Sequence, residues 1–509
     1  MVISNSMQRG AVHGKQRYWL LPAAAAGVLF MITGLALAQT PDSSRDLNVI
    51  IIVLDALRAD HLGCYGYARK TSPFIDSLAA EGILFQRAMS NSSYTRESVS
   101  VLMTGILPSS SPTGTGWFAK PNPATVNMGE LFTNAGYATL FLTDAPVFAT
   151  TPFGRGFTEK VRIPTKWGES GSGPAVSKRA LTFVAQHTGK KFMMYLHYID
   201  PHTPYSPPDE YYLRFAKTRL PNPPDLMGEI RPNLPKFLAE GFGPGEARFE
   251  DQIAGYDGEI ALNDFAVATL CHGLKDLGVL DRTLIIFTSD HGEEFLEHGF
   301  VEHAWTVYNE VLHVPLILWQ PGLFPPARID ARVSHCDLLP TLVRLLDLPC
   351  ERTDLAGTPL LTRQGDQWIF AAPTKPIISE EMLQTRPQVR AVIQGDFKYI
   401  AAQKWLTPAE CAEASKHQKP GIEAIRTGTF EGVDILGPPV YEALYNLAND
   451  PKEQHNVLAE SPDRALELRT IMETYKASCP KPIKGPTAEP QDQQWTPERQ
   501  DQMQALGYF

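Results

Sequence analysis

The chain has 509 residues, of which 43% are hydrophobic, and a formal net charge of −10 at pH 7. This length allows a large core and more than one domain. The acidic balance and the lack of a long basic run exclude a protein that follows a phosphate backbone, so we expect no nucleic-acid partner. An acidic protein that handles anions needs local positive charge, and a bound cation is the simplest source of it.

The first 38 residues have the layout of an export signal. Basic residues precede a continuous apolar stretch, YWLLPAAAAGVLFMITGLALA, which ends in the small-x-small pattern Ala36-Leu37-Ala38. The alternative is an uncleaved membrane anchor, since the stretch is just long enough to span a bilayer. We expect residues 1–38 to be a signal peptide and the protein to be periplasmic or secreted. A membrane would be a partner only if this segment stays uncleaved.

Five apolar runs recur along the chain with helical patterns between them. They are residues 47–55, 138–144, 191–200, 283–290 and 313–319. Runs without polar alternation are typical of strands buried on both faces. Apolar residues three and four apart between Ile253 and Leu277 predict a long helix, and Gly278 stands where its C-cap is expected. Strands alternating with helices predict an α/β fold, a doubly wound, mostly parallel sheet flanked by helices.

The pattern changes after about residue 370. The segment QVRAVIQGDFKYIAA alternates around a Gly-Asp turn, as an antiparallel hairpin does, and a helical segment, SPDRALELRTIMETY, follows it. We therefore expect a catalytic domain over residues 46–370 and a smaller C-terminal α+β domain, a sheet with a helix and a tail, over residues 371–509. The Pro-rich stretch 201–235 is expected to cross the strand ends, where substrate-binding loops often lie.

Three of the predicted strands end on an acid, namely Asp55, Asp200 and Asp290. Ligands of open α/β sheets bind outside the carboxyl ends of the strands, so acids placed there lie close together in space. A single terminal Asp is most often only the cap of the next helix. Several at one edge of the sheet indicate a site.

The ligand types around these acids suit one divalent cation. Asp55, Asp290, His291 and the hydroxyl of Thr95 form a mixed oxygen and nitrogen set. Zinc or manganese fits this ligation best, and calcium and magnesium remain open. A cation on the Thr95 oxygen would activate it for nucleophilic attack. The alternative is that Thr95 only caps the helix predicted after it.

Three histidines near these residues are candidates for general acids. They are His202, His298 and His303. Each could donate a hydrogen bond or a proton to a leaving group. The alternative for each is a structural or solvated histidine, which is the more common case for any one of them.

Several segments of the chain match a known family in order. They are NVIIIVLDALRADHLGCYGY, TSPFIDSLAAEGILFQRAMS, SVLMTGILP, YLHYIDPHTPY, LGVLDRTLIIFTSDHGEEFLEHG, HVPLIL, ALYNLANDPKEQHNVL and QALGYF. Together they resemble the sulfatase family of the alkaline phosphatase superfamily, from about residue 46 to the end. The resemblance implies an alkaline phosphatase-like fold and an ester hydrolase. It places the metal ligands at Asp55, Asp290 and His291, and the nucleophile ten residues before Gly105, at Thr95.

The nucleophile region departs from the formylglycine type of sulfatase. That type carries C/S-x-P-x-R, where this chain has Thr95-Arg96-Glu97-Ser98-Val99. Threonine cannot yield the aldehyde, so we expect no formylglycine and a phospho-threonine intermediate instead. Asp290-His291 is typical of the phosphatase and phosphotransferase branches. Arg96 is a candidate for contacting a non-bridging substrate oxygen, with a solvated arginine at a helix start as the alternative.

The leading prediction is therefore an exported, metal-dependent hydrolase of phosphate or phosphonate esters, acting on a small anionic ester or an anionic glycan or lipid. Three alternatives stay open: a sulfuric ester hydrolase without formylglycine, a transferase of phospho-headgroups, and a non-catalytic anion-binding protein. The complete ligand set weighs against the binding protein. The single apolar segment weighs against the transferase, because transferases of this branch usually carry several membrane helices.

Overall fold

The structure is a computed structural model, in which the following residues are described: 46–110, 125–150, 152–164, 171–221, 226–364, 367–370, 375–381, 389–402 and 441–479. The predicted signal peptide and the closing QALGYF lie outside these ranges. None of the helices in the described ranges combines the length and the apolar character needed to cross a bilayer.

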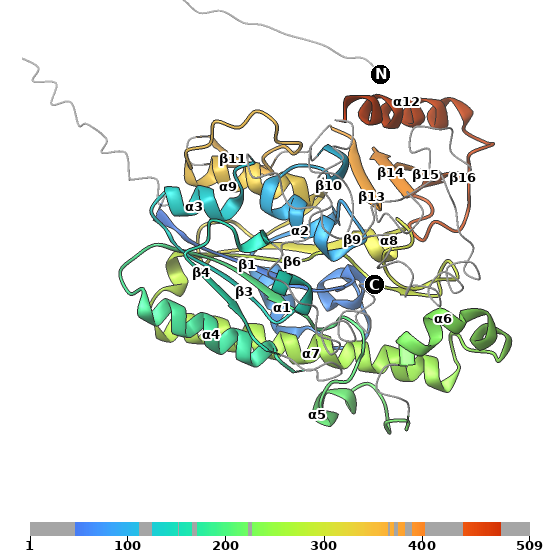
Figure 1. The fold of residues 1–509 in the computed structure, drawn as a ribbon, viewed down its shortest axis with the longest axis horizontal. Helices are drawn as coiled ribbons and strands as arrows, with labels where there is room; N and C mark the ends of the chain where they lie inside the picture. The colour runs from blue at the N-terminus through green and yellow to red at the C-terminus, as the bar shows by residue number, and fades with distance from the viewer. Residues whose placement is uncertain are drawn as a thin grey trace, which may run out of the picture. The chain divides into compact units, whose positions relative to one another are not determined.

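A mixed, mostly parallel sheet lies at the centre of the fold (Figure 1). Within the described ranges it has eight strands in the order β10-β2-β9-β6-β1-β5-β3-β4. These are β1 (Asn48–Leu54), β2 (Ile83–Met89), β3 (Ala138–Thr143), β4 (Glu159–Arg162), β5 (Phe192–Tyr198), β6 (Thr283–Ser289), β9 (His313–Trp319) and β10 (Ala327–Ser334). Strand β9 runs antiparallel to its neighbours β2 and β6, and the other pairs are parallel. The predicted α/β class is confirmed.

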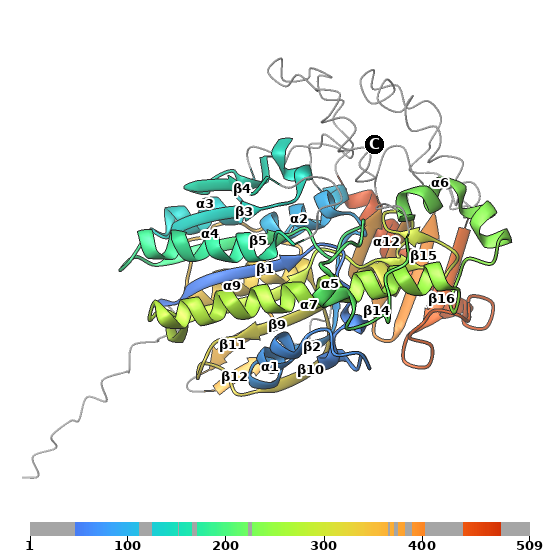
Figure 2. The ribbon, with the colours of Figure 1, turned by 90° about the horizontal axis from the view of Figure 1, so that it is seen from below.

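Helices cover both faces of this sheet, as Figures 1 and 2 show. One face packs against α1 (Pro73–Glu81), α4 (Gly173–Gln186) and α7 (Ala247–Asp276), and the other against α2 (Thr95–Thr104), α3 (Met128–Asn134) and α9 (Leu338–Leu346). Alternate residues of β1 enter the two separate cores, because successive side chains of a strand point to opposite faces. The long predicted helix is α7, and Gly278 after it has φ +67°, as expected of a C-cap.

A smaller antiparallel sheet follows the central one in sequence. It contains β13 (Ile377–Glu381), β14 (Val389–Gln394), β15 (Phe397–Ala402) and β16 (Tyr441–Asn446), and α12 (Pro462–Ser478) packs on one of its faces. The predicted hairpin is present as β14 and β15, which are joined by a turn at Gly395 and Asp396. The domain boundary at residue 370 stays a prediction.

The remaining α-helices and strands of the described ranges lie in the segments that connect the elements named above. They are α5 (Asp209–Tyr212), α6 (Leu226–Ala239), β7 (Glu294–Phe295), β8 (Val301–Glu302), α8 (Asn309–Leu312), β11 (Leu361–Gln364) and β12 (Gln367–Phe370). The Pro-rich stretch leads from β5 into α5 and α6. The segment from β6 to β9, which includes β7, β8 and α8, carries His291, His298 and His303.

Candidate active site

Two neighbouring strands deliver the two central carboxylates. Strands β1 and β6 pair in parallel, with Leu54 opposite Ser289, so the next residue of each strand, Asp55 and Asp290, leaves the sheet at the same edge. The amide of Ala56 donates to Asp290 Oδ1 at 3.1 Å, which fixes one carboxylate against the other strand. Both acids are fully buried. The expectation that these two acids converge is met.

His291 turns a basic nitrogen toward this pair. Its Nδ1 lies 2.9 Å from the carbonyl oxygen of Gly292, which can only accept, so Nδ1 carries the proton. Nε2 therefore presents a lone pair. It lies 3.6 Å from Asp55 Oδ1 and 3.6 Å from Asp290 Oδ2. The imidazole nitrogen and two carboxylate oxygens thus face one another.

Thr95 completes this group from the start of α2. It is the first residue of that helix, after Tyr94, which makes no side-chain cap hydrogen bond. The Thr95 hydroxyl lies 3.1 Å from His291 Nε2 and donates to its lone pair. One turn further on, Ser98 Oγ donates to the backbone oxygen of Asp290 at 2.6 Å and so ties α2 to the end of β6. The Thr95 hydroxyl therefore faces His291 and the two carboxylates, and does not cap the first turn of its own helix.

The electrostatics of the pair suit a cation. Burial, followed by the charge of Asp290, raises the pKa of Asp55 well above its usual value. Burial opposes ionisation of Asp290 too, but the nearby imidazoles of His291 and His197 and the amides of Ala56 and His291 hold its pKa below the usual value. Asp55 Oδ1 and Asp290 Oδ2 are buried and accept no hydrogen bond within the described residues. A dication would satisfy both oxygens and allow both carboxylates to ionise, so the residues fit a metal.

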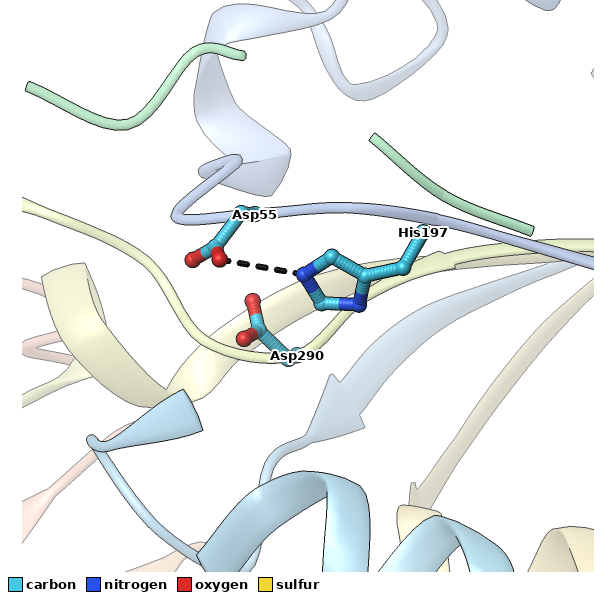
Figure 3. Close-up of side chains that lie close together, drawn as sticks. All are labelled: Asp55, His197 and Asp290. Atoms are coloured by element: carbon cyan, nitrogen blue, oxygen red, sulfur yellow. Dashed lines mark hydrogen bonds and ion pairs between the residues drawn. The ribbon is translucent and has the colours of Figure 1, made fainter. Parts of the chain in front are cut away.

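His197 also belongs to this group, although the sequence did not indicate it (Figure 3). It lies in β5, opposite Val53 of β1, and its Nε2 is 3.0 Å from Asp55 Oδ2. Asp55, His197 and Asp290 each offer a ligand atom within 4.8 Å of the others. However, the Tyr195 hydroxyl lies 3.1 Å from Nδ1, which suits a ring that accepts there and donates from Nε2 to Asp55. The His197 contact therefore orients Asp55, while His291 Nε2 faces both carboxylates.

His303 and His202 lie next to His291. The ring centroids of His291 and His303 are 4.3 Å apart, and those of His202 and His303 are 4.9 Å apart. His303 Nδ1 is 2.8 Å from Glu293 Oε1, while the Tyr205 hydroxyl donates to Glu293 Oε2 at 2.9 Å. The site thus combines a carboxylate pair, a buried hydroxyl and a row of three imidazoles at one sheet edge.

Comparison with known proteins identifies the family of this chain. The model of the family described as Sulfatase matches residues 47–348, more than half of the chain. The chain belongs to the sulfatase family. It is 24% identical over 460 residues to the uncharacterized sulfatase YidJ of Escherichia coli K12, covering 81% of this chain and 83% of that protein. It is 26% identical over 476 residues to human arylsulfatase A, covering 85% and 86%.

The fold of this sulfatase-family protein is also found in a solved phosphonate monoester hydrolase from Agrobacterium radiobacter. The TM-score is 0.59 at 19% sequence identity, covering 85% of this chain and 95% of that one. The fold implied by the resemblance in the sequence is thereby confirmed. Membership of the family also supports the prediction that the chain is a hydrolase of ester bonds.

His298 of this sulfatase-family protein lies in a different cluster from the other candidate histidines. Its Nδ1 pairs with Glu310, its Nε2 lies 3.1 Å from the backbone oxygen of Glu453, and its ring stacks on Tyr308 with centroids 3.6 Å apart. The Glu453 carboxylate in turn pairs with the fully buried Lys398 of β15 at 2.8 Å. These contacts join the segment between β6 and β9 to the C-terminal sheet, which is a structural use of the ring.

Two further residues singled out from the sequence are buried near the sheet edge. Arg96 follows Thr95 in α2 and is 9% exposed, so it is not the solvated arginine of the alternative interpretation. Asp200 accepts a hydrogen bond from the Gly171 amide at 2.9 Å, and burial raises its pKa to about 6. Among the described residues, the metal-like group contains Asp55 and Asp290 but not Asp200.

Proposed function

We propose that this sulfatase-family protein hydrolyses phosphate or phosphonate esters through a covalent intermediate on Thr95, without formylglycine. The observation that carries the proposal is the 3.1 Å contact between Thr95 Oγ1 and His291 Nε2, beside two buried carboxylates. Asp55, Asp290 and His291, with the Thr95 oxygen, would hold one divalent cation, for which zinc or manganese is favoured over calcium or magnesium. The phosphonate hydrolase with the same fold supports this choice of ester.

The residues of the chain divide the work as follows. Thr95 Oγ1, after its proton has passed to solvent, attacks phosphorus in line and breaks the bond between phosphorus and the leaving oxygen. Helix α2, which Ser98 ties to β6, holds the nucleophile in place. The cation that Asp55, Asp290 and His291 would hold would supply a lowered pKa for the Thr95 hydroxyl and would offset the charge of the substrate. Arg96 contacts a non-bridging oxygen of the transferred group. Water then releases this group from Thr95, and preorganised charge supplies most of the rate enhancement.

His303 is the better placed of the candidate acids. Burial, followed by the charge of Glu302, raises the pKa of Glu293, so the Glu293–His303 pair retains a proton beside the site. His202, in contrast, donates from Nδ1 to the Thr203 carbonyl at 2.7 Å, and burial lowers its pKa to about 4. We propose that His303 protonates the leaving group, while His202 packs against it and His298 is structural.

Replacing His303 by glutamine is expected to slow esters with poor leaving groups by about a hundredfold, but nitrophenyl esters by less than about tenfold, because nitrophenolate needs no proton. Rates on alkyl, phenyl and nitrophenyl phosphates would test this. His298→Gln is the matched control and should lower stability without changing the dependence on the leaving group. His202→Gln should give a small, uniform loss. Equal losses on all esters for His303→Gln would contradict its role as an acid.

Assays on aryl phosphate, bis-aryl phosphate, aryl phosphonate and aryl sulfate esters, with and without chelator, test the function itself. We expect turnover of the phosphorus esters that chelator abolishes and added zinc or manganese restores. Turnover of sulfate alone would favour a sulfuric ester hydrolase without formylglycine, and transfer to an added alcohol would favour a transferase. Turnover of none, with metal present, would favour an anion-binding protein.

The cellular setting of this activity follows from the N-terminal segment. We propose that residues 1–38 direct export, so that the enzyme meets its substrate in the periplasm or outside the cell. Small anionic esters, or anionic glycans and lipids, are the proposed substrates, with no part for nucleic acid.

A further inference from the structure

One arginine from the Pro-rich excursion lies beside the proposed acid. Arg231 belongs to α6, and its Nη1 pairs with Glu302 Oε2 at 2.7 Å. Glu302 directly precedes His303 in the chain, so this ion pair holds the guanidinium next to the segment that carries the acid. The side chain of Arg231 is 13% exposed, so it is largely withdrawn from water but still reachable.

The guanidinium also acts on His202. Burial is the main cause that lowers the pKa of this imidazole to about 4, and the charge of Arg231 is a small contribution in the same direction. Because Arg231 pairs with Glu302, the residue before His303, the guanidinium lies close to the segment of the proposed acid, where the leaving group would depart. The His202 ring packs on the His303 ring on this part of the site, with centroids 4.9 Å apart.

Arg231 has N–H donors that its ion pair with Glu302 does not use. A guanidinium has five N–H donors. Contact with Glu302 uses Nη1, and the buried Nε makes no hydrogen bond within the described residues. An anion that approached this arginine would meet a fixed, partly desolvated donor group, for which charge-assisted hydrogen bonds are strongest.

We propose that Arg231 binds a second anionic group of the substrate, on the leaving-group side of the scissile bond. The inference rests on the proposed function and narrows its substrate class. It selects esters whose leaving alcohol carries a carboxylate, a sulfate or a further phosphate. Glu302 then acts as a positioning residue that orients the Arg231 guanidinium. The anionic group of the substrate would take over part of the hydrogen bonding to this guanidinium.

A pair of substrates that differ only in this charge tests the proposal. They are 4-carboxyphenyl phosphate and its uncharged analogue, 4-carbamoylphenyl phosphate. Arg231→Gln should raise KM about tenfold for the carboxylate and less than about threefold for the amide, since one charge-assisted hydrogen bond is lost. Glu302→Gln removes the ion pair but keeps an amide oxygen that can accept from Arg231 and so position it, and this variant should largely keep the preference for the carboxylate. Arg248→Gln, on α7 and paired with Glu246, is the matched control.

If the arginine only links α6 to its neighbours, Arg231→Gln and Glu302→Gln should impair both substrates alike, and that result would overturn the proposal. If the wild-type protein turns over neither ester, the proposed function fails, and the same four proteins are compared by calorimetric binding of the two compounds. A preference for the carboxylate that only Arg231→Gln removes would then still support the anion site. Equal binding of both compounds by the wild type would refute it.

Discussion

Thr95→Ala is expected to lower kcat/KM for aryl phosphate by at least about a thousandfold, which is the scale of losing a catalytic nucleophile. The Thr95 hydroxyl lies 3.1 Å from His291 Nε2, beside the buried carboxylates of Asp55 and Asp290. Steady-state rates on one phosphorus ester, with metal present, would measure the loss. Denaturation midpoints close to that of the wild type would show that the fold survives.

Two further variants test whether the loss of activity is specific to the Thr95 hydroxyl. Thr95→Ser keeps the oxygen and should retain measurable activity and form a phospho-serine that mass spectrometry of quenched enzyme detects. Thr104→Ala removes a threonine at the other end of α2, whose hydroxyl donates to the backbone oxygen of Ser100 at 2.7 Å, and should retain activity. Full activity in Thr95→Ala, or a phosphoryl group found on another residue, would refute the nucleophile.

Asp290→Asn is expected to abolish activity and to weaken binding of zinc or manganese at least about a hundredfold. The change removes one of two buried charges, yet the amide oxygen can still accept from the backbone N–H groups of Ala56 and His291. The apo variant should therefore keep its fold. Added metal should raise the Tm of the wild type, because binding to the native state alone stabilises it, and should leave the variant unchanged.

Asp144→Asn is the matched control for this experiment. Asp144 also follows a strand of the central sheet, β3, but its carboxylate accepts from the Ile199 amide at 2.7 Å and from Ser172. It should retain the rise in Tm with metal. Normal metal binding by Asp290→Asn, or loss of binding in both variants alike, would contradict the ligand set proposed here.

The sequence alone could predict the parts of the site that follow strands directly. Asp55 and Asp290 come after buried apolar runs, and parallel strands end at the same edge, so their meeting follows from the fold class. His197 could not be found in this way, because it lies within β5 and only its register opposite Val53 brings it beside Asp55. A polar ring in an otherwise apolar run, FMMYLHY, was the signal available.

The candidate histidines show what the sequence could not predict. His298 and His303 are close in the chain and looked equivalent, but a contact with Glu453, 155 positions further on, draws His298 away from the others. The direction of the Thr95 hydroxyl was equally open, since a helix start suits a cap as well as a nucleophile. The role of each histidine and the direction of the Thr95 hydroxyl depend on contacts with residues distant in sequence, and these contacts cannot be predicted from periodicity or motif spacing.

The buried pair of Lys398 and Glu453 links the small sheet to the stretch that bears His303. Glu453 meets both the His298 ring and, through its carboxylate, the amide of Asn309 at 2.6 Å, on either side of the stretch that bears His303. These two contacts, one on each side of His303, restrict the motion of the segment between His298 and Asn309. If His303 delivers the proton as proposed, substitutions at Lys398 or Glu453 would therefore change proton delivery although both residues are remote from the reacting atoms.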